Sequence, residues 1–170
     1  MASVSAYPLR LFPALLAAAL PAAAVTTILN PPPSEVRLRV GAAGGVTLVQ
    51  FNITAANAGN GNPINQAGGA ILVRAEAREA GCAAKNATLT VTTPANLTSG
   101  GNTIPFSTIS WTTSDADISP GTYLAPGTQA IATFQNCRRV QNNHTFRFSN
   151  ATVYPSGTYN GTATYTLSMP

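Results

Sequence analysis

The stretch that decides the fold is Tyr159-Asn-Gly-Thr-Ala-Thr-Tyr-Thr-Leu-Ser-Met-Pro170. Its side chains alternate strictly: Ala163, Tyr165, Leu167 and Met169 point to one side, and three threonines and a serine point to the other. A period of two residues is typical of a β-strand with one buried and one exposed face. We therefore predict a strand over 162–169 whose four apolar side chains face a hydrophobic core.

The same signal recurs along the chain, between turns rich in Gly, Asn and Pro. Further strands are predicted over 36–40, 46–53, 70–78, 87–93, 104–113, 129–137 and 144–154. None of them is joined to the next by a convincing amphipathic helix. Short strands separated by turn signals indicate an all-β sandwich or barrel. We predict a single immunoglobulin-like β-sandwich of about seven or eight antiparallel strands.

The N-terminal residues are typical of an export signal. Arg10 precedes an apolar run over 11–20, and Pro21 is followed by three alanines that supply a cleavage site. The run is too short for a transmembrane helix, which needs about twenty residues; the alternative is an N-terminal membrane anchor. We expect a signal peptide over 1–24, a Pro-rich extended segment over 25–35, a β-sandwich over 36–170, and no membrane span in the mature chain.

Charged residues are rare. Only 8% of the chain is charged, against about a quarter in an ordinary soluble protein, and the net charge is +4. The basic residues are scattered along the sequence, and only Arg138 and Arg139 are adjacent, so we expect no clustered basic patch and no nucleic-acid partner. A surface with few charges carries little repulsion between identical copies and suits packing against them.

The chain has two cysteines, Cys82 and Cys137. An even pair in an exported chain predicts a disulfide, here between the ends of neighbouring strands. The loop that the bridge would enclose is long, and the chain-entropy model gives it about 4 kcal/mol of stabilisation.

No group of residues forms a recognisable catalytic, metal or cofactor motif. Asp115 and Asp117 lie in a loop rich in Ser, Gly and Pro, where aspartate commonly forms turns. His144 is the only histidine, and we expect it at a strand edge. The sequence therefore predicts a protein that is not an enzyme and binds no cofactor or metal.

With its export signal, its alternating N-terminal strand and its last fourteen residues, the chain resembles the subunits of chaperone–usher pili. Gly157 is the fourteenth residue from the end, and the alternation of Ala163, Tyr165, Leu167 and Met169 follows it. The resemblance implies a structural subunit of a bacterial surface fibre, with adhesion as a further role, exported through the periplasm to the cell surface. It implies a periplasmic chaperone, an outer-membrane usher, and identical or related subunits as partners.

In that family a strand from one subunit completes the sandwich of the next, and here the candidate donor residues are Val36, Leu38 and Val40. The alternative is that 35–40 pairs within its own domain, as the first strand of a closed sandwich. A different function is also open: a self-contained secreted module that recognises carbohydrate or a surface partner through Trp111 and Tyr123. A buried Trp111 would indicate a core residue, and an exposed one would favour binding.

Overall fold

The computed structural model describes residues 34–41 and 47–170. The signal peptide and most of the Pro-rich segment predicted above lie outside the described residues. The strands are β1 (Ser34–Val40), β2 (Ile64–Asn65), β3 (Ile71–Glu79), β4 (Asn86–Thr93), β5 (Asn96–Ser99), β6 (Asn102–Pro105), β7 (Ile109–Thr113), β8 (Gly121–Thr122), β9 (Gly127–Gln135), β10 (Arg138–Phe148) and β11 (Thr164–Ser168). Two short 3₁₀ turns, η1 (Ala80–Cys82) and η2 (Phe106–Thr108), lie between strands.

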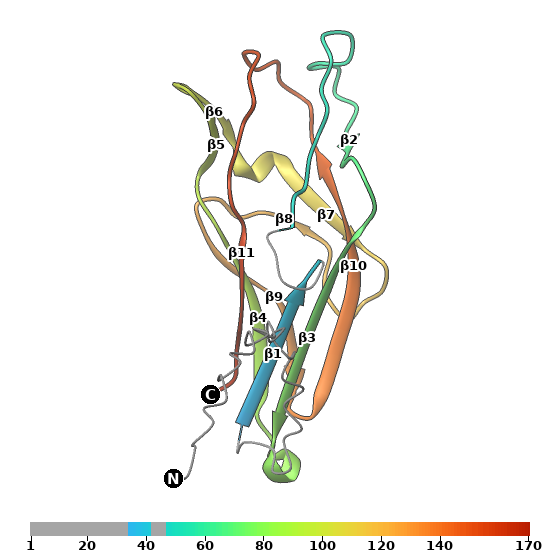
Figure 1. Ribbon diagram of the computed structural model, residues 1–170, viewed down its shortest axis with the longest axis vertical. Helices are drawn as coiled ribbons and strands as arrows, with labels where there is room; N and C mark the ends of the chain where they lie inside the picture. Colours follow the sequence, from blue (N-terminus) through green and yellow to red (C-terminus); the bar gives the residue numbers. More distant parts are fainter. Residues whose placement is uncertain (1–33, 42–46) are drawn as a thin grey trace, which may run out of the picture.

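The strands form two antiparallel layers and a small hairpin (Figure 1). The larger sheet has the order β1-β3-β10-β7-β8, with β2 paired to the far end of β10, and the smaller sheet has the order β11-β4-β9. The hairpin of β5 and β6 stands at one end of the molecule. The predicted all-β sandwich is confirmed. No helix in the described part of the chain is both long and apolar enough to cross a membrane.

The core lies between the layers and follows the predicted alternation. Val73, Ala75 and Ala77 of β3 and Leu89 and Val91 of β4 are at most 1% exposed. These side chains form one cluster with the aromatic residues of the larger sheet. Tyr165 and Leu167 of β11, with Ala163 and Met169 directly before and after it, are partly buried and pack against this cluster, so the predicted inward face is confirmed.

The structure corrects several strand boundaries. The described part of the predicted strand 46–53 forms only an isolated bridge, between Gln50 and Ala67. The predicted strand 104–113 is divided by η2 into β6 and β7, and β5 lies where a turn was expected. The predicted strand 144–154 is the second half of β10, which begins at Arg138 and ends at Phe148.

A β-bulge also changes one predicted face. The pairing of β4 with β9 shifts between Leu89 and Thr90, which leaves Ile131 as an extra residue on β9. An extra residue turns the following side chains to the opposite face. Ile131 is therefore buried and Ala130 is exposed, although strict alternation would place Ala130 on the same face as Ala132 and Phe134.

Candidate functional site

The strand predicted as a donor, β1, pairs with β3 of its own chain. The antiparallel register runs from Ser34 opposite Glu79 to Val40 opposite Val73. Directly opposed residues share a face, so Val36, Leu38 and Val40 point toward the core. In this single chain the N-terminal strand thus adopts the alternative arrangement, the first strand of its own sandwich.

The burial of β1 is shallow because β1 is an edge strand. Val36 is 41% exposed, and Leu38 and Val40 are only partly buried. Their partners on β3, which is a central strand, are fully buried. Leu38 and Val40 therefore contact the core without closing it off from solvent, and Val36 is not among the residues packed against the core.

Two edge strands of different sheets meet on this side of the sandwich. β1 and β11 run side by side, with Cα atoms within 8 Å (Figure 1). Among the described residues β1 pairs only with β3, and β11 pairs only with β4. Each strand therefore keeps a backbone edge outside the two ladders, and the half-buried Tyr165 and Leu167 face the core beside it.

The C-terminal residues are positioned by close contacts. A Cβ atom at Gly157 would lie 2.5 Å from Oγ of Ser99, so glycine allows the chain to pass close to β5. The hydroxyls of Tyr165 and Tyr123 lie 3.3 Å apart. Burial raises the pKa of both phenols well above the usual value, so both remain neutral donors and acceptors.

The two aromatic residues considered as ligand contacts belong to the core. Trp111 is 3% exposed and Tyr123 is 4% exposed. Their rings pack with centroids 4.9 Å apart, and Trp111 Nε1 donates to the carbonyl oxygen of Ser119 at 2.9 Å. The loop after β7 folds over Trp111. The prediction that Trp111 and Tyr123 contact a ligand is therefore wrong.

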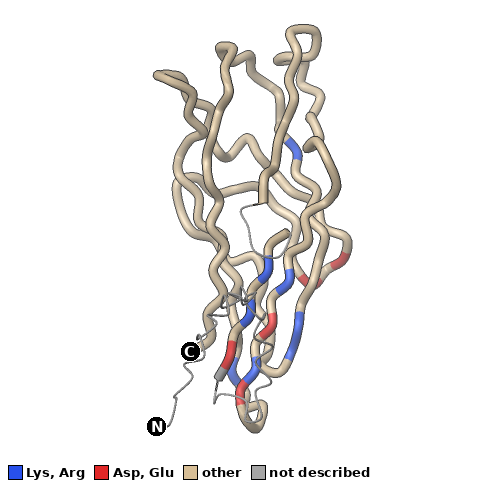
Figure 2. The backbone as a smooth tube through the Cα atoms, viewed as in Figure 1, with Lys and Arg blue, Asp and Glu red and all other residues tan. Residues whose placement is uncertain are grey.

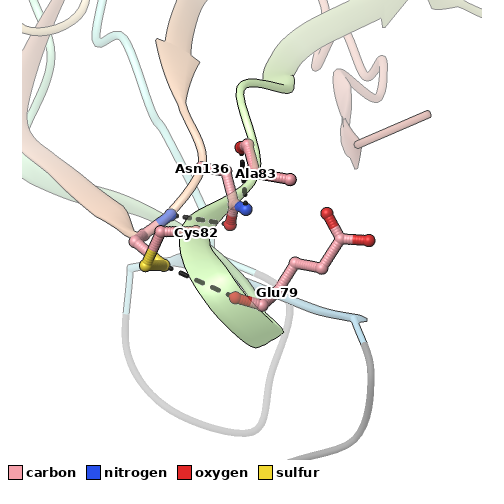
Figure 3. The surroundings of a disulfide bond; sticks show 5 residues. Glu79, Cys82, Ala83 and Asn136 are labelled. Carbon is pink, nitrogen blue, oxygen red and sulfur yellow. Dashed lines mark hydrogen bonds between the residues drawn. A yellow bond between two sulfur atoms is a disulfide. The ribbon is translucent and has the colours of Figure 1, made fainter.

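The predicted disulfide between Cys82 and Cys137 is confirmed, with Cα atoms 5.5 Å apart. It joins the turn between β3 and β4 to the turn between β9 and β10, and both turns cross from one sheet to the other. Asn136 stabilises the same corner (Figure 3): its side chain donates to Ala83 O at 3.2 Å and accepts from Cys137 N at 2.7 Å. The bridge therefore clamps the two crossings at one end.

The polar loop residues have structural roles. Asn142, almost fully buried, donates to the backbone and side chain of Asp115 and accepts from Ser114 N. Asp115 Oδ1 also accepts from Asp117 N at 2.9 Å, and Asp117 pairs with Arg138 at 3.0 Å. The described residues contain no group of three or more possible metal ligands.

His144 lies in the core, not at the expected strand edge. It is fully buried on β10, nearly parallel to the Trp111 ring with centroids 6.2 Å apart. Neither ring nitrogen has a hydrogen-bond partner among the described residues. Burial lowers the pKa of His144 to about 4, so the ring is neutral at pH 7.

Charged residues gather toward the disulfide end of the chain trace (Figure 2). Five arginines that are scattered in sequence lie on the outward face of β1, β3 and β10: Arg37, Arg39, Arg74, Arg78 and Arg139. The expectation of no clustered basic patch is therefore wrong. The signal was present in the sequence, since the charges on β1 and β3 fall on the outward side of each alternation.

No protein-family model, curated protein or solved structure matches this chain. The resemblance to pilus subunits therefore depends on the residues quoted above.

Proposed function

We propose that the protein is a structural subunit of a bacterial surface fibre, in which copies join by exchanging β1. In the fibre, β1 of one copy pairs with β3 of the next in the register that it has in the single chain. The chain would be exported and then handled by a periplasmic chaperone and an outer-membrane usher before assembly at the surface.

The observation that supports the proposal is the shallow edge position of β1 beside β11. Because β1 pairs with one strand only, it can leave without breaking any other ladder. Its departure would uncover Val73, Ala75 and Ala77 on β3, next to the half-buried Tyr165 and Leu167 of β11. Exposed apolar side chains and unpaired backbone groups are costly, and a strand from another copy covers both.

Leu38 and Val40 suit the role of exchanged side chains. They already pack against the core in the single chain, so the same contacts form when the strand comes from a neighbour. Pairing of β1 within one chain and between two chains therefore differs mainly in the translational and rotational freedom that is lost when copies associate. The share of exchanged copies then depends on the protein concentration.

A binding module that uses Trp111 and Tyr123 is the weaker proposal. Both rings are buried, and neither can contact a ligand without opening the core.

The test uses pairs of cysteines placed on opposed residues. Arg37 and Glu76 lie directly opposite each other on the outward face of β1 and β3. Differently tagged Arg37→Cys and Glu76→Cys chains are refolded together at high concentration and mildly oxidised. We expect a covalent heterodimer on a gel, because exchange places the two thiols in different chains. The double variant Arg37→Cys/Glu76→Cys in one chain shows that the pair can bridge.

The matched control uses an opposed pair that exchange of β1 leaves within one chain. Thr90 of β4 and Thr166 of β11 are such a pair. A mixture of Thr90→Cys and Thr166→Cys chains should give no heterodimer. A double variant that seals within one chain, together with no heterodimer from the mixed single variants, would contradict exchange of β1.

A further inference from the structure

We propose that the outward face of β1, β3 and β10 near the disulfide binds an acidic polysaccharide through its arginine side chains. We call this surface the basic face, defined by Arg37, Arg39, Arg74, Arg78 and Arg139. The inference goes beyond fibre assembly and applies to a single copy as well as to a polymer.

The strand register brings these side chains together. Arg39 is opposite Arg74, and Arg37 is opposite Glu76, which is in turn opposite Arg139. Arg78 is opposite Glu35. Neighbouring strands lie about 4.8 Å apart, so charges from three strands form one continuous surface.

The basic face has more positive than negative groups. Five guanidiniums face two carboxylates, an excess of three charges. Arg37 pairs with Glu35, and Arg74 pairs with Glu76 at 3.2 Å. Within the described residues, Arg78 and Arg139 form no ion pair, so their positive charges are available to a partner.

A hollow of about 490 Å³ adjoins these two arginines. Its lining includes the disulfide, two carboxylates and three guanidiniums, those of Glu76, Glu79, Arg78, Arg138 and Arg139. The corner is rigid, because the bridge clamps two turns there. The backbone that carries both arginines is therefore fixed, so an anion that binds in the hollow orders only their side chains.

The chemistry of the basic face selects among possible anionic partners. Among the described residues a second copy offers no acidic patch, since Glu35, Glu76, Glu79 and Asp117 are already paired within their own chain. Single-stranded nucleic acid needs aromatic platforms for its bases, and the outward positions of these three strands carry none.

A polysaccharide that carries repeated carboxylates can be bound by guanidinium groups spaced along a surface. Each planar guanidinium can donate two parallel hydrogen bonds to a carboxylate. A flat, charged sheet surface without aromatic residues therefore fits a polyuronate best, and an exported protein would meet such polymers outside the cell.

The test compares two arginines of the same strand. Arg139 and Arg147 both point outward from β10, but Arg147 lies about 26 Å along the strand, outside the basic face. Binding of the mature chain to polygalacturonate is measured by calorimetry at low salt. We expect Arg139→Gln to weaken binding about tenfold, the effect of losing one charge-assisted contact, and Arg147→Gln to change it little.

Further measurements make the result decisive. Arg139→Lys should restore part of the affinity for polygalacturonate. Thermal unfolding should show that all variants are folded. Neutral dextran, which carries no carboxylates, should not bind. Equal losses in Arg139→Gln and Arg147→Gln would overturn the site, because only net charge would then matter. Tighter, Arg139-dependent binding of a single-stranded oligonucleotide would overturn the choice of partner, and no binding of polygalacturonate at low salt would overturn the proposal.

Discussion

The two ends of the sandwich are stabilised by different chemistry. At the disulfide end, the chain is joined covalently and carries ion pairs such as Arg74–Glu76 and Lys85–Glu79. The opposite end is formed by the loop over 52–63, the β5–β6 hairpin and the segment over 149–163, and these segments contain no charged residue (Figure 2).

At this uncharged end, hydrogen bonds from a side-chain amide hold a loop in place. Asn150 is 1% exposed and has a positive φ of 52°. Its side chain accepts from Gly59 N at 2.9 Å and donates to Asn57 O at 2.8 Å and Asn62 O at 3.1 Å. One buried amide thus fixes the loop over 57–62. The comparison shows that an end of the molecule without charged residues can still have its loops held in place, here by hydrogen bonds to a buried amide.

The largest expected effect is at the disulfide end. Replacement of Cys82 and Cys137 by serine should lower the free energy of unfolding by about 4 kcal/mol, because the unfolded chain regains the freedom of a long loop. Urea unfolding measures the loss, and reduction of the unmodified protein should reproduce it. A loss below about 1 kcal/mol would show that the crossings are held without the bridge.

The next effect concerns His144, which lies on β10 between the two ends. Its folded pKa is about 4 and its ordinary value is 6.5, so the unfolded chain binds the proton first as the pH falls. The contribution of the neutral ring to the free energy of unfolding should be complete above pH 6.5. It should decrease by about 3 kcal/mol as the pH falls to 4. Urea unfolding across this range measures it, and His144→Leu should remove that part of the slope. An unchanged slope would contradict a neutral, buried ring.

A smaller effect is expected at the uncharged end. Asn150→Ala should cost about 2 kcal/mol, because it leaves part-buried backbone groups of the 57–62 loop without the partner that holds them. Hydrogen exchange should accelerate at Gly59 and Gly61, whose amides bond to Asn150. The matched control is Asn143→Ala on the exposed side of β10, and an equal cost there would refute the role of the buried amide.

The smallest effect is expected for an ion pair. Glu76→Gln should change the free energy of unfolding by less than about 1 kcal/mol, since both partners are partly exposed and water screens them. High salt should reduce even this difference. A loss above about 2 kcal/mol would mean that charge, and not the bridge, stabilises the disulfide end.

Alternation predicted the strands that run without an extra residue of their own. β3, β4 and β11 have the expected inward residues because none of them carries a bulge; the extra residue opposite β4 lies on β9. The same pattern failed over 46–53, where Leu48 is 78% exposed and Ile53 is 42% exposed. Apolar alternation indicates only that a strand is possible, and no partner strand lies beside these residues in the described structure.

The candidate site was predicted in part. The disulfide and the inward face of β11 followed from residue type and spacing, which are local properties. The burial of Trp111 depends on how the following loop folds, and the basic face depends on which strands are neighbours. Neither can be determined from one strand alone, because both are set by the order of strands in the sheet.

The buried amide of Asn150 also limits how the protein can be produced. Asn150-Ala-Thr152 matches the acceptor sequence for N-linked glycans, and transfer would replace a hydrogen of the same Nδ2 that donates into the 57–62 loop. A eukaryotic secretory host attaches sugars before folding is complete, so occupancy at Asn150 would block closure of this loop. A bacterial host, which does not attach these sugars, avoids that conflict.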